Sequence, residues 1–258
     1  MYKLLTIGFI ISCLVGFSNT KNKGIALIGG GDCPEAIEWL CQRANNNQFV
    51  VLTCSTYFLP EDIIIKYKME VIPLVVRSRE QANSLEIINK IKEAGVLYIS
   101  GGDQANYVNF WKDTKLSKTI NSLVNKIPIG ATSAGLAIAG EYYFSALHGT
   151  INSEECTIDK NDPRITLGNK FLNIPSLKGY ITDSHYTERC RLERHKIFME
   201  KILKDYKLSE IKGLGIDEKT ALCLEGTSGL VVGQGRCTIL DGISNQFVFQ
   251  SGQKCNLH

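Results

Sequence analysis

The stretch Ile129–Glu141, IGATSAGLAIAGE, joins an apolar run to a serine among small residues and then to a second apolar run. The first run is typical of a buried strand, and the small residues after it predict a tight turn into a helix. Ser133 stands at that turn. It is either a nucleophile on a strand-to-helix elbow, written G-x-S-x-G, or a residue that caps the helix and lets two elements pack closely.

The same order of strand and helix recurs along the N-terminal half. Helical spacing separates the strand-like runs, in Pro34–Arg43, Gln81–Ala94 and, as two pieces, Ala105–Asn125. This alternation predicts an α/β fold with a mostly parallel central sheet that helices cover on both faces, in three layers. The runs themselves are short and rich in Val and Ile: Gly24–Gly30, Phe49–Cys54, Glu70–Val76, Val96–Gly102 and Ile127–Ser133.

Composition narrows the class of protein. The chain has 258 residues, of which 44% are hydrophobic and 21% charged, as expected for one large globular domain. The net charge of +3 is too small to indicate binding to nucleic acid or to an anionic membrane.

The N-terminus predicts export. Lys3 precedes an apolar run from Leu4 to Phe17, and small and polar residues follow it. This is the pattern of a signal peptide, assigned to residues 1–20, in which Gly16 and Ser18 are the small residues that a signal peptidase needs, and the run is too short for a membrane span. The mature chain, residues 21–258, is then one secreted or periplasmic domain. Acylation of Cys13 as a lipoprotein is the alternative.

Nine cysteines include Cys13, so eight remain in the mature chain. An even number in an oxidising compartment predicts some disulfides, and buried free thiols are the alternative. The chain has no C-x-x-C, and its four histidines show no zinc-binding spacing. No metal site is therefore predicted.

In α/β folds, ligands bind beyond the carboxyl ends of the strands. The first such end is Gly29–Asp32, GGGD, which lacks the third glycine of a dinucleotide fingerprint because Pro34 stands there. We expect its glycines to allow close approach of a substrate or a neighbouring loop. The second is Ser100–Gln104, SGGDQ. Its N–H groups suit an oxyanion and Gln104 a substrate amide, although a plain turn explains the stretch as well.

A nucleophilic serine needs a base. His185 follows the strand-like Tyr180–Thr182 and is the candidate, whereas His195 falls inside a helix and is expected on the surface. Asp217 and Glu218 end another apolar run, and either of them could orient the histidine. The G-T-S-G around Ser228 lies between two strand-like runs and predicts only a hairpin turn.

Four motifs occur in order: SGGDQ, ATSAG, TDSHYTERCRLER and GLGIDEKTA. Together they resemble the cyanophycinase branch of the serine peptidase family S51, which also holds aspartyl dipeptidases of the peptidase E type. The resemblance extends from about residue 24 to 240. It implies a flavodoxin-like fold related to class I glutamine amidotransferases. It also implies cleavage at aspartate, above all of β-Asp-Arg links in cyanophycin, without a cofactor, by a chain that is often a homodimer.

The resemblance also implies roles for single residues. Ser133 matches the nucleophile, His185 the general base and Glu218 the orienting carboxylate, with Asp217 as the alternative. The N–H groups of Gly102 and Ala134 would receive the oxyanion. The substrate-binding positions are Gln104, Asp183, Ser184, Arg189, Arg191 and Arg194.

Two residues depart from the family pattern. Ser184 stands where cyanophycinases have Gln, which alters a substrate contact, and Ala131 stands where the elbow has Gly. On a regular helix, moreover, Arg189 would lie about 40° from His185 and Arg194 about 180° from it. Either the segment begins irregularly, or some of the arginines face away from the pocket.

These observations predict an exported peptidase that forms an acyl-enzyme at Ser133 and cleaves aspartyl peptides. An α-aspartyl dipeptidase and a non-catalytic peptide-binding protein are the alternatives. A cysteine hydrolase is disfavoured because no cysteine lies in the elbow.

Overall fold

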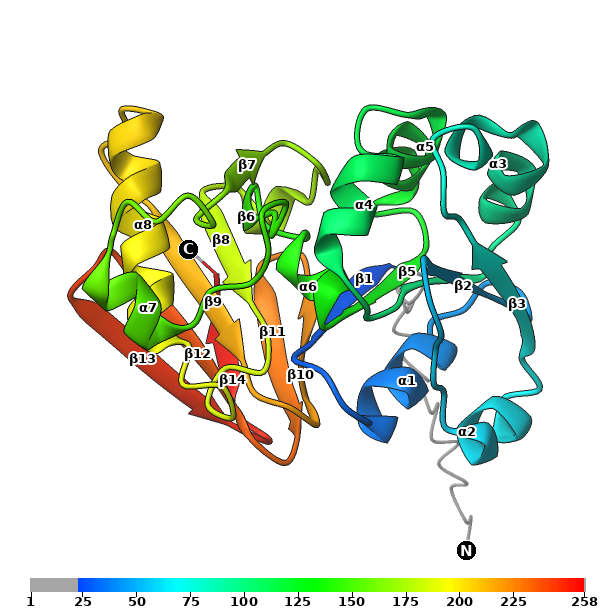
Figure 1. Cartoon of the computed structure of the whole chain (residues 1–258). Helices are drawn as coiled ribbons and strands as arrows, with labels where there is room; N and C mark the ends of the chain where they lie inside the picture. The colour runs from blue at the N-terminus through cyan, green and yellow to red at the C-terminus, as the bar shows by residue number, and fades with distance from the viewer. Residues whose placement is uncertain (1–22, 258) are drawn as a thin grey trace, which may run out of the picture.

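A computed structural model describes residues 23–257 (Figure 1). The leader-like segment and Cys13 lie outside the described residues, so export and acylation stay predictions. No helix between residues 23 and 257 is long and apolar enough to cross a bilayer.

The larger sheet has eight strands, five of them parallel as predicted. The parallel strands follow the spatial order β1-β5-β4-β2-β3, and three antiparallel strands extend the sheet beyond β1. The parallel strands are β1 (Gly24–Ile28), β2 (Gln48–Thr53), β3 (Glu70–Val75), β4 (Val96–Ile99) and β5 (Pro128–Thr132). The antiparallel ones are β10 (Thr220–Glu225), β11 (Ser228–Gly233) and β14 (Lys254–Asn256).

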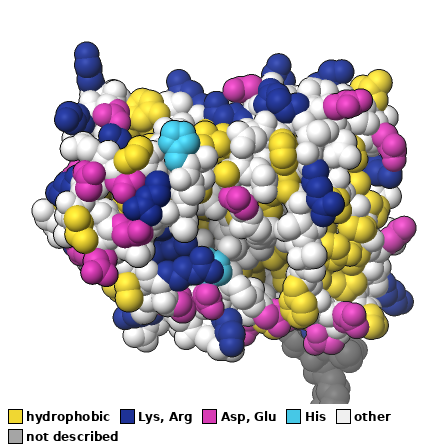
Figure 2. Space-filling model, in the orientation of Figure 1, with side chains coloured by type: hydrophobic (Ala, Val, Ile, Leu, Met, Phe, Trp, Pro, Cys, Tyr) yellow, Lys and Arg dark blue, Asp and Glu magenta, His cyan; other side chains and the backbone are white. Residues whose placement is uncertain are grey.

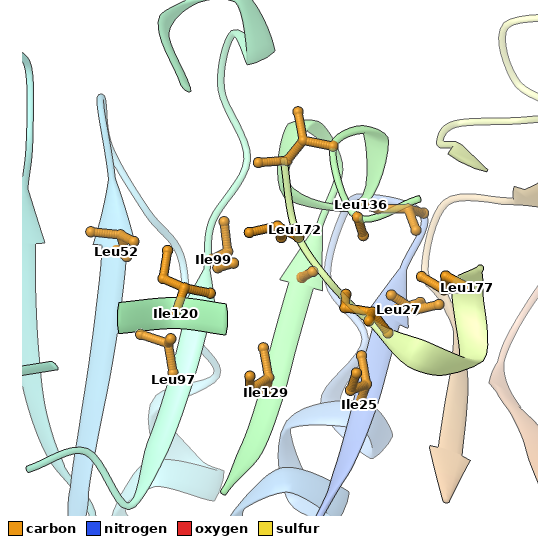
Figure 3. Packing of buried hydrophobic residues seen from close by; sticks show 14 of the residues in the cluster. Ile25, Leu27, Leu52, Leu97, Ile99, Ile120, Ile129, Leu136, Leu172 and Leu177 are labelled. Atoms are coloured by element: carbon orange, nitrogen blue, oxygen red, sulfur yellow. The ribbon is translucent and has the colours of Figure 1, made fainter. Parts of the chain in front are cut away.

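Helices cover both faces of this sheet, which confirms the predicted three layers. On β1, Ile25 and Leu27 pack into one core, and Ala26 and Ile28 into the other, as the alternation of a strand requires. Figure 3 shows the first core, where Ile120 lies among leucines and isoleucines of β2 and β4. This core receives η1 (Gln81–Asn83), α3 (Leu85–Lys92), α4 (Gln104–Trp111) and α5 (Lys115–Leu123), and the second receives α1 (Pro34–Cys41) and α2 (Glu61–Lys66).

A second sheet, of six strands, is an addition to the predicted architecture. Helices α7 (Ser153–Ile158) and α8 (Leu192–Asp205) lie against it in Figure 1, and Phe198 of α8 stacks on Phe144 at 4.8 Å between ring centroids. In spatial order its strands are β13 (Asn245–Gln250), β12 (Arg236–Asp241), β9 (Lys212–Ile216), β8 (Tyr180–Asp183), β6 (Tyr142–Phe144) and β7 (Leu167–Asn169), and η2 (Pro175–Leu177) precedes β8.

The chain crosses between the two sheets twice near Ser133. After β5 it passes through the short helix α6 (Ala134–Ala137) into β6 of the second sheet. It returns through residues 217–219, which join β9 to β10 of the first sheet. The ends of β5, β8 and β9 are therefore brought to one place.

The predicted hairpin around Ser228 is confirmed. Strands β10 and β11 pair antiparallel, with Glu225 opposite Ser228, and Gly226 takes a φ of 61° in the turn between them. Ser228 is exposed at the start of β11, at the end of the strand away from the elbow.

Of the two predictions for the cysteines, the structure shows buried free thiols and not disulfides in the part of the chain that it describes. All eight cysteines among residues 23–257 are unpaired, and all but Cys190 are buried. Burial raises the pKa of Cys33, Cys41 and Cys54 to about 12, so these thiols stay protonated near neutral pH.

Charges of both signs are interspersed over the face shown in Figure 2. Hydrophobic side chains gather on the side of that face where α2 and β3 lie in Figure 1, and Ile65 and Val75 of these elements are exposed.

Candidate active site

Ser133 lies on a strained turn between β5 and α6. Its φ of 52° and ψ of −110° lie outside the regions that residues with a side chain favour. The turn is held because the Ser133 N–H donates to Ile28 O at 3.0 Å. A side chain at Gly135 would lie 2.5 Å from Ile99 O, so α6 can pass the sheet only with glycine there. Ala131 needs no glycine, because it lies within β5, paired with Leu27 and Ile99.

His185 and Glu218 complete a chain of hydrogen bonds with Ser133. Ser133 Oγ lies 2.7 Å from His185 Nε2, and His185 Nδ1 lies 2.5 Å from Glu218 Oε1. Because a carboxylate can only accept, Nδ1 carries the proton of the neutral ring and Nε2 accepts from the serine hydroxyl. This is the arrangement in which a histidine serves as base to a serine.

The neighbouring carboxylate, Asp217, serves another purpose. Only 3% of it is exposed, and it accepts hydrogen bonds from Thr187 N at 3.0 Å, Thr187 Oγ1 at 2.6 Å and Arg236 N at 2.9 Å. Asp217 therefore ties the segment after His185 to β12. Of the two carboxylates that the sequence left open, Glu218 is the one that contacts the histidine.

The end of β1 holds all three segments together. Three consecutive carbonyls, of Ile28, Gly29 and Gly30, accept from the N–H groups of Ser133, His185 and Lys219 at 3.0, 2.8 and 2.7 Å. A side chain at Gly30 would lie 2.3 Å from His185 Cε1, and one at Gly29 2.0 Å from Asp217 O. The prediction that these glycines allow close approach of a neighbouring loop is confirmed.

Burial lowers the pKa of His185, and the hydrogen bond to Glu218 opposes this only in part. The net direction is below the ordinary value of 6.5. Desolvation disfavours the imidazolium, so the ring is neutral and able to accept a proton at pH 7.

This pKa predicts the pH dependence of the reaction at Ser133. The base works only when unprotonated, so a lowered pKa places the acidic limb of kcat/KM below pH 6.5. The measurement is the pH profile of kcat/KM for a dipeptide, with the labelling rate of an uncharged fluorophosphonate as the control that removes substrate titration. An acidic limb at or above pH 6.5 would contradict the burial argument.

A pocket of about 490 Å³ opens beside the serine. Ser133, His185 and Gly102 line one part of it, and Tyr57 and Phe58 another. A side chain at Gly101 would lie 3.2 Å from Ser133 Cβ, so the Gly101–Gly102 turn can lie close against the nucleophile. Within residues 23–257, the N–H groups of Gly102 and Ala134 donate to no other protein group. Both remain available for an oxyanion.

The arginines after His185 are distributed unequally. Helix α8 begins only at Leu192, so the segment before it is irregular, which was one of the two expectations. Arg189 is exposed, whereas Arg191 and Arg194 are buried and paired with Asp183. None of these three arginines is among the residues that line the pocket.

The other predicted substrate-binding residues, Gln104 and Ser184, also lie outside the pocket lining. Gln104 begins α4, half-buried, and does not line the pocket, and the buried Ser184 receives a hydrogen bond from Arg191. Sequence reasoning missed Tyr57 and Phe58, whose only signal is their place shortly after β2.

The expectation of a surface position for His195 is wrong. The side chain is fully buried, 3.1 Å from Tyr186 Oη and 3.2 Å from Ile181 O. Helix α8 packs its His195 side against the second sheet, where Gly213 leaves room for the imidazole ring.

The model of Peptidase family S51 matches residues 61–232. A cyanophycinase of Geminocystis herdmanii (strain PCC 6308) is 27% identical over 172 residues, which cover 66% of this chain and 57% of that protein. A cyanophycinase of Synechococcus elongatus is 29% identical over 176 residues, 67% of this chain and 49% of that protein. The chain thus spans about half the length of the curated relatives it matches.

Two solved structures share the fold. A peptidase from an acI-B1 Actinobacterium superposes with a TM-score of 0.69 at 18% identity, covering 91% of this chain and 97% of that one. A putative peptidase E protein from Listeria monocytogenes EGD-e superposes with a TM-score of 0.50 at 17% identity, covering 83% of this chain and all of that one. These similarities confirm the predicted flavodoxin-like α/β class.

Proposed function

Because the chain belongs to peptidase family S51, we propose that it is a serine peptidase that cleaves peptide or isopeptide bonds next to aspartate. The substrates we favour are β-Asp-Arg dipeptide units, because the similar proteins include cyanophycinases. The leader-like residues 1–20 extend the proposal to an exported enzyme. Homodimerisation, which the resemblance implies, stays a prediction.

The observation that carries this proposal is the hydrogen-bonded chain from Ser133 through His185 to Glu218, with distances of 2.7 and 2.5 Å. Its nucleophile lies on a strained elbow that lines a pocket, as an acyl-transfer site requires. A serine that merely caps a helix needs no buried histidine base.

The mechanism we propose is acyl transfer. His185 Nε2 accepts the hydroxyl proton while Ser133 Oγ attacks the carbonyl carbon, and Glu218 stabilises the imidazolium that forms. The N–H groups of Gly102 and Ala134 receive the oxyanion. The imidazolium then protonates the leaving amine, and a water molecule activated by His185 hydrolyses the ester at Ser133.

A dipeptide panel tests the substrate. It compares β-Asp-Arg, β-Asp-Lys and α-Asp-X dipeptides with the Asp/Arg polymer, and we expect turnover of the β-linked substrates alone. Turnover of α-Asp-X alone would replace the proposal with an α-aspartyl dipeptidase. No turnover, with peptide binding intact and no labelling of Ser133 by a fluorophosphonate, would indicate a peptide-binding protein instead.

A further inference from the structure

We propose that Asp183, Arg191 and Arg194 form a buried ionic cluster that positions His185, and that they do not bind the substrate carboxylate. The proposal rests on the proposed function, since it concerns the same base. It separates the arginines after the histidine into two kinds. Arg191 and Arg194 hold the base in place, whereas Arg189 is exposed and takes no part in the cluster.

Hydrogen bonds inside the protein engage both oxygens of Asp183 and every nitrogen of the Arg194 guanidinium. Asp183 Oδ1 accepts from Arg191 Nη1 at 2.8 Å and from Arg194 Nη2 at 2.7 Å, and Oδ2 accepts from Arg194 Nε at 2.9 Å. The remaining Arg194 nitrogen, Nη1, donates to Ile151 O at 2.8 Å. The guanidinium of Arg194 is therefore held on all three nitrogens by acceptors within the protein.

Burial separates the cluster from the pocket. Asp183, Arg191 and Arg194 are 4%, 8% and 3% exposed, and none of them lines the pocket beside Ser133. Burial alone would raise the pKa of Asp183, but the attraction of Arg194 and Arg191 outweighs it and lowers that pKa. The carboxylate is thus ionised, and its charge is matched within the protein.

Arg191 connects the cluster to the histidine. Its Nη1 also donates to Ser184 O at 2.8 Å and to Ser184 Oγ at 3.3 Å, and its N–H donates to Tyr186 O at 2.9 Å. These bonds hold the residues on both sides of His185. They are needed because His185 itself takes a φ of 47°, which is unfavourable for a residue with a side chain.

The loop that carries His185 ends just before Arg191. Arg189 N donates to His185 O at 3.1 Å, and Cys190, just before Arg191, takes a second positive φ of 48°. The unfavourable φ values of His185 and Cys190 persist only where surrounding hydrogen bonds and packing hold the backbone in place. Without the Arg191 guanidinium, we expect the loop to relax and the His185 ring to move from Ser133 Oγ.

A lysine could reproduce the side-chain hydrogen bonds of Arg191 but not those of Arg194. Arg191 reaches all of its side-chain acceptors with one nitrogen, Nη1, and a lysine ammonium also carries its donors on one nitrogen. Arg194 uses Nε, Nη1 and Nη2 on different acceptors, which lysine cannot match. Arg191→Lys is therefore the conservative variant that retains the cluster.

The experiment compares Arg191→Met, Arg191→Lys and, as the matched exposed control, Arg189→Met. The readouts are kcat and KM for β-Asp-Arg and the labelling rate of Ser133 by an uncharged fluorophosphonate, which has no carboxylate to bind. We expect Arg191→Met to lower kcat and the labelling rate together by about 10- to 100-fold with KM nearly unchanged, because small misplacements of a base cost that much. We expect Arg191→Lys to recover most of both. Arg189→Met leaves the cluster intact, so its kcat and labelling rate should stay at the wild-type level whatever its effect on KM.

A raised KM for Arg191→Met, with wild-type kcat and labelling, would overturn the proposal and make Arg191 a substrate ligand. If Arg191→Met fails to fold, the same comparison is made with Arg191→Gln, a neutral variant that also removes the guanidinium, where a defect must again fall on kcat and labelling and not on KM, and wild-type kcat and labelling would overturn the proposal. A defect confined to KM would overturn the proposal in that variant too.

The imidazole NMR signals of His185, assigned by their loss in His185→Gln, give a readout that needs no activity. At a pH well above 6.5 the ring is neutral in every variant, so the charges of Arg189 and Arg191 no longer move the signals through the pKa of His185. There we expect the signals to shift in Arg191→Met and to stay in place in Arg189→Met. Suppose that the wild-type protein is inactive and its Ser133 does not react with the fluorophosphonate, but the His185 signals still shift in Arg191→Met. That result would refute the proposed function and leave the positioning role standing. If the wild-type protein is active but the His185 signals do not shift in Arg191→Met, the positioning role alone is refuted.

Discussion

Ser133→Ala is expected to lower kcat/KM for β-Asp-Arg by at least about 10,000-fold, because the acyl-enzyme can no longer form. Substrate binding through the pocket residues should remain. The measurement is steady-state hydrolysis together with fluorophosphonate labelling, which should be lost completely. The matched control is Ser228→Ala, which removes the exposed serine of the hairpin and should change neither readout.

The folded state should tolerate Ser133→Ala. Serine and alanine share the same penalty at a φ of 52°, so the strain of the elbow is unchanged, and we expect a similar melting temperature. Retained hydrolysis in a folded Ser133→Ala protein would remove the serine from the mechanism. Loss of activity in Ser228→Ala to the same extent would show that the assay reports something other than the elbow.

Glu218→Gln should lower kcat by about 1,000- to 10,000-fold with little change in the melting temperature. The glutamine amide can donate to His185 Nδ1, which drives the proton to Nε2 and leaves the ring unable to accept from Ser133. Because the hydrogen bond that His185 donates to Glu218 raises the pKa of His185, its loss should also shift the remaining acidic limb to lower pH. The pH profile of kcat measures both effects.

Asp217→Asn is the matched control for that variant. It alters the adjacent carboxylate, which is buried and accepts from Thr187 and Arg236, so we expect a lower melting temperature. Below that temperature its kcat should stay well above that of Glu218→Gln. A larger loss of kcat in folded Asp217→Asn than in Glu218→Gln would mean that the wrong carboxylate has been placed on the histidine.

The part of the fold that was predictable depends on local pattern. The parallel strands are continuous apolar runs with helical spacing between them, and each was found to within a few residues. Strands β6 and β7 of the second sheet were missed because they have only three residues each, too few for periodicity to show. Helix α2 has six residues and was missed for the same reason.

The candidate site was predictable where it depends on strand ends. Ser133 and His185 were found because β5 and β8 end beside them. The positions of the arginines were not, because the segment from Ser184 to Arg191 is neither strand nor helix and no period relates its side chains. The choice between Asp217 and Glu218 was open for a similar reason, since adjacent residues at a crossing between two sheets point in different directions.

The sequence by itself therefore determined the parallel α/β core, the elbow at Ser133, the hairpin at Ser228 and the candidate base His185. These follow from apolar periodicity and turn chemistry, which act over a few residues. Only the tertiary structure decided that Glu218 contacts the histidine. It also decided that Arg191 and Arg194 pair with Asp183 outside the pocket. The carbonyls of Ile28, Gly29 and Gly30, which hold the three segments together, are likewise known only from it. Those outcomes depend on two sheets meeting at their strand ends, a packing of distant segments that no local pattern encodes.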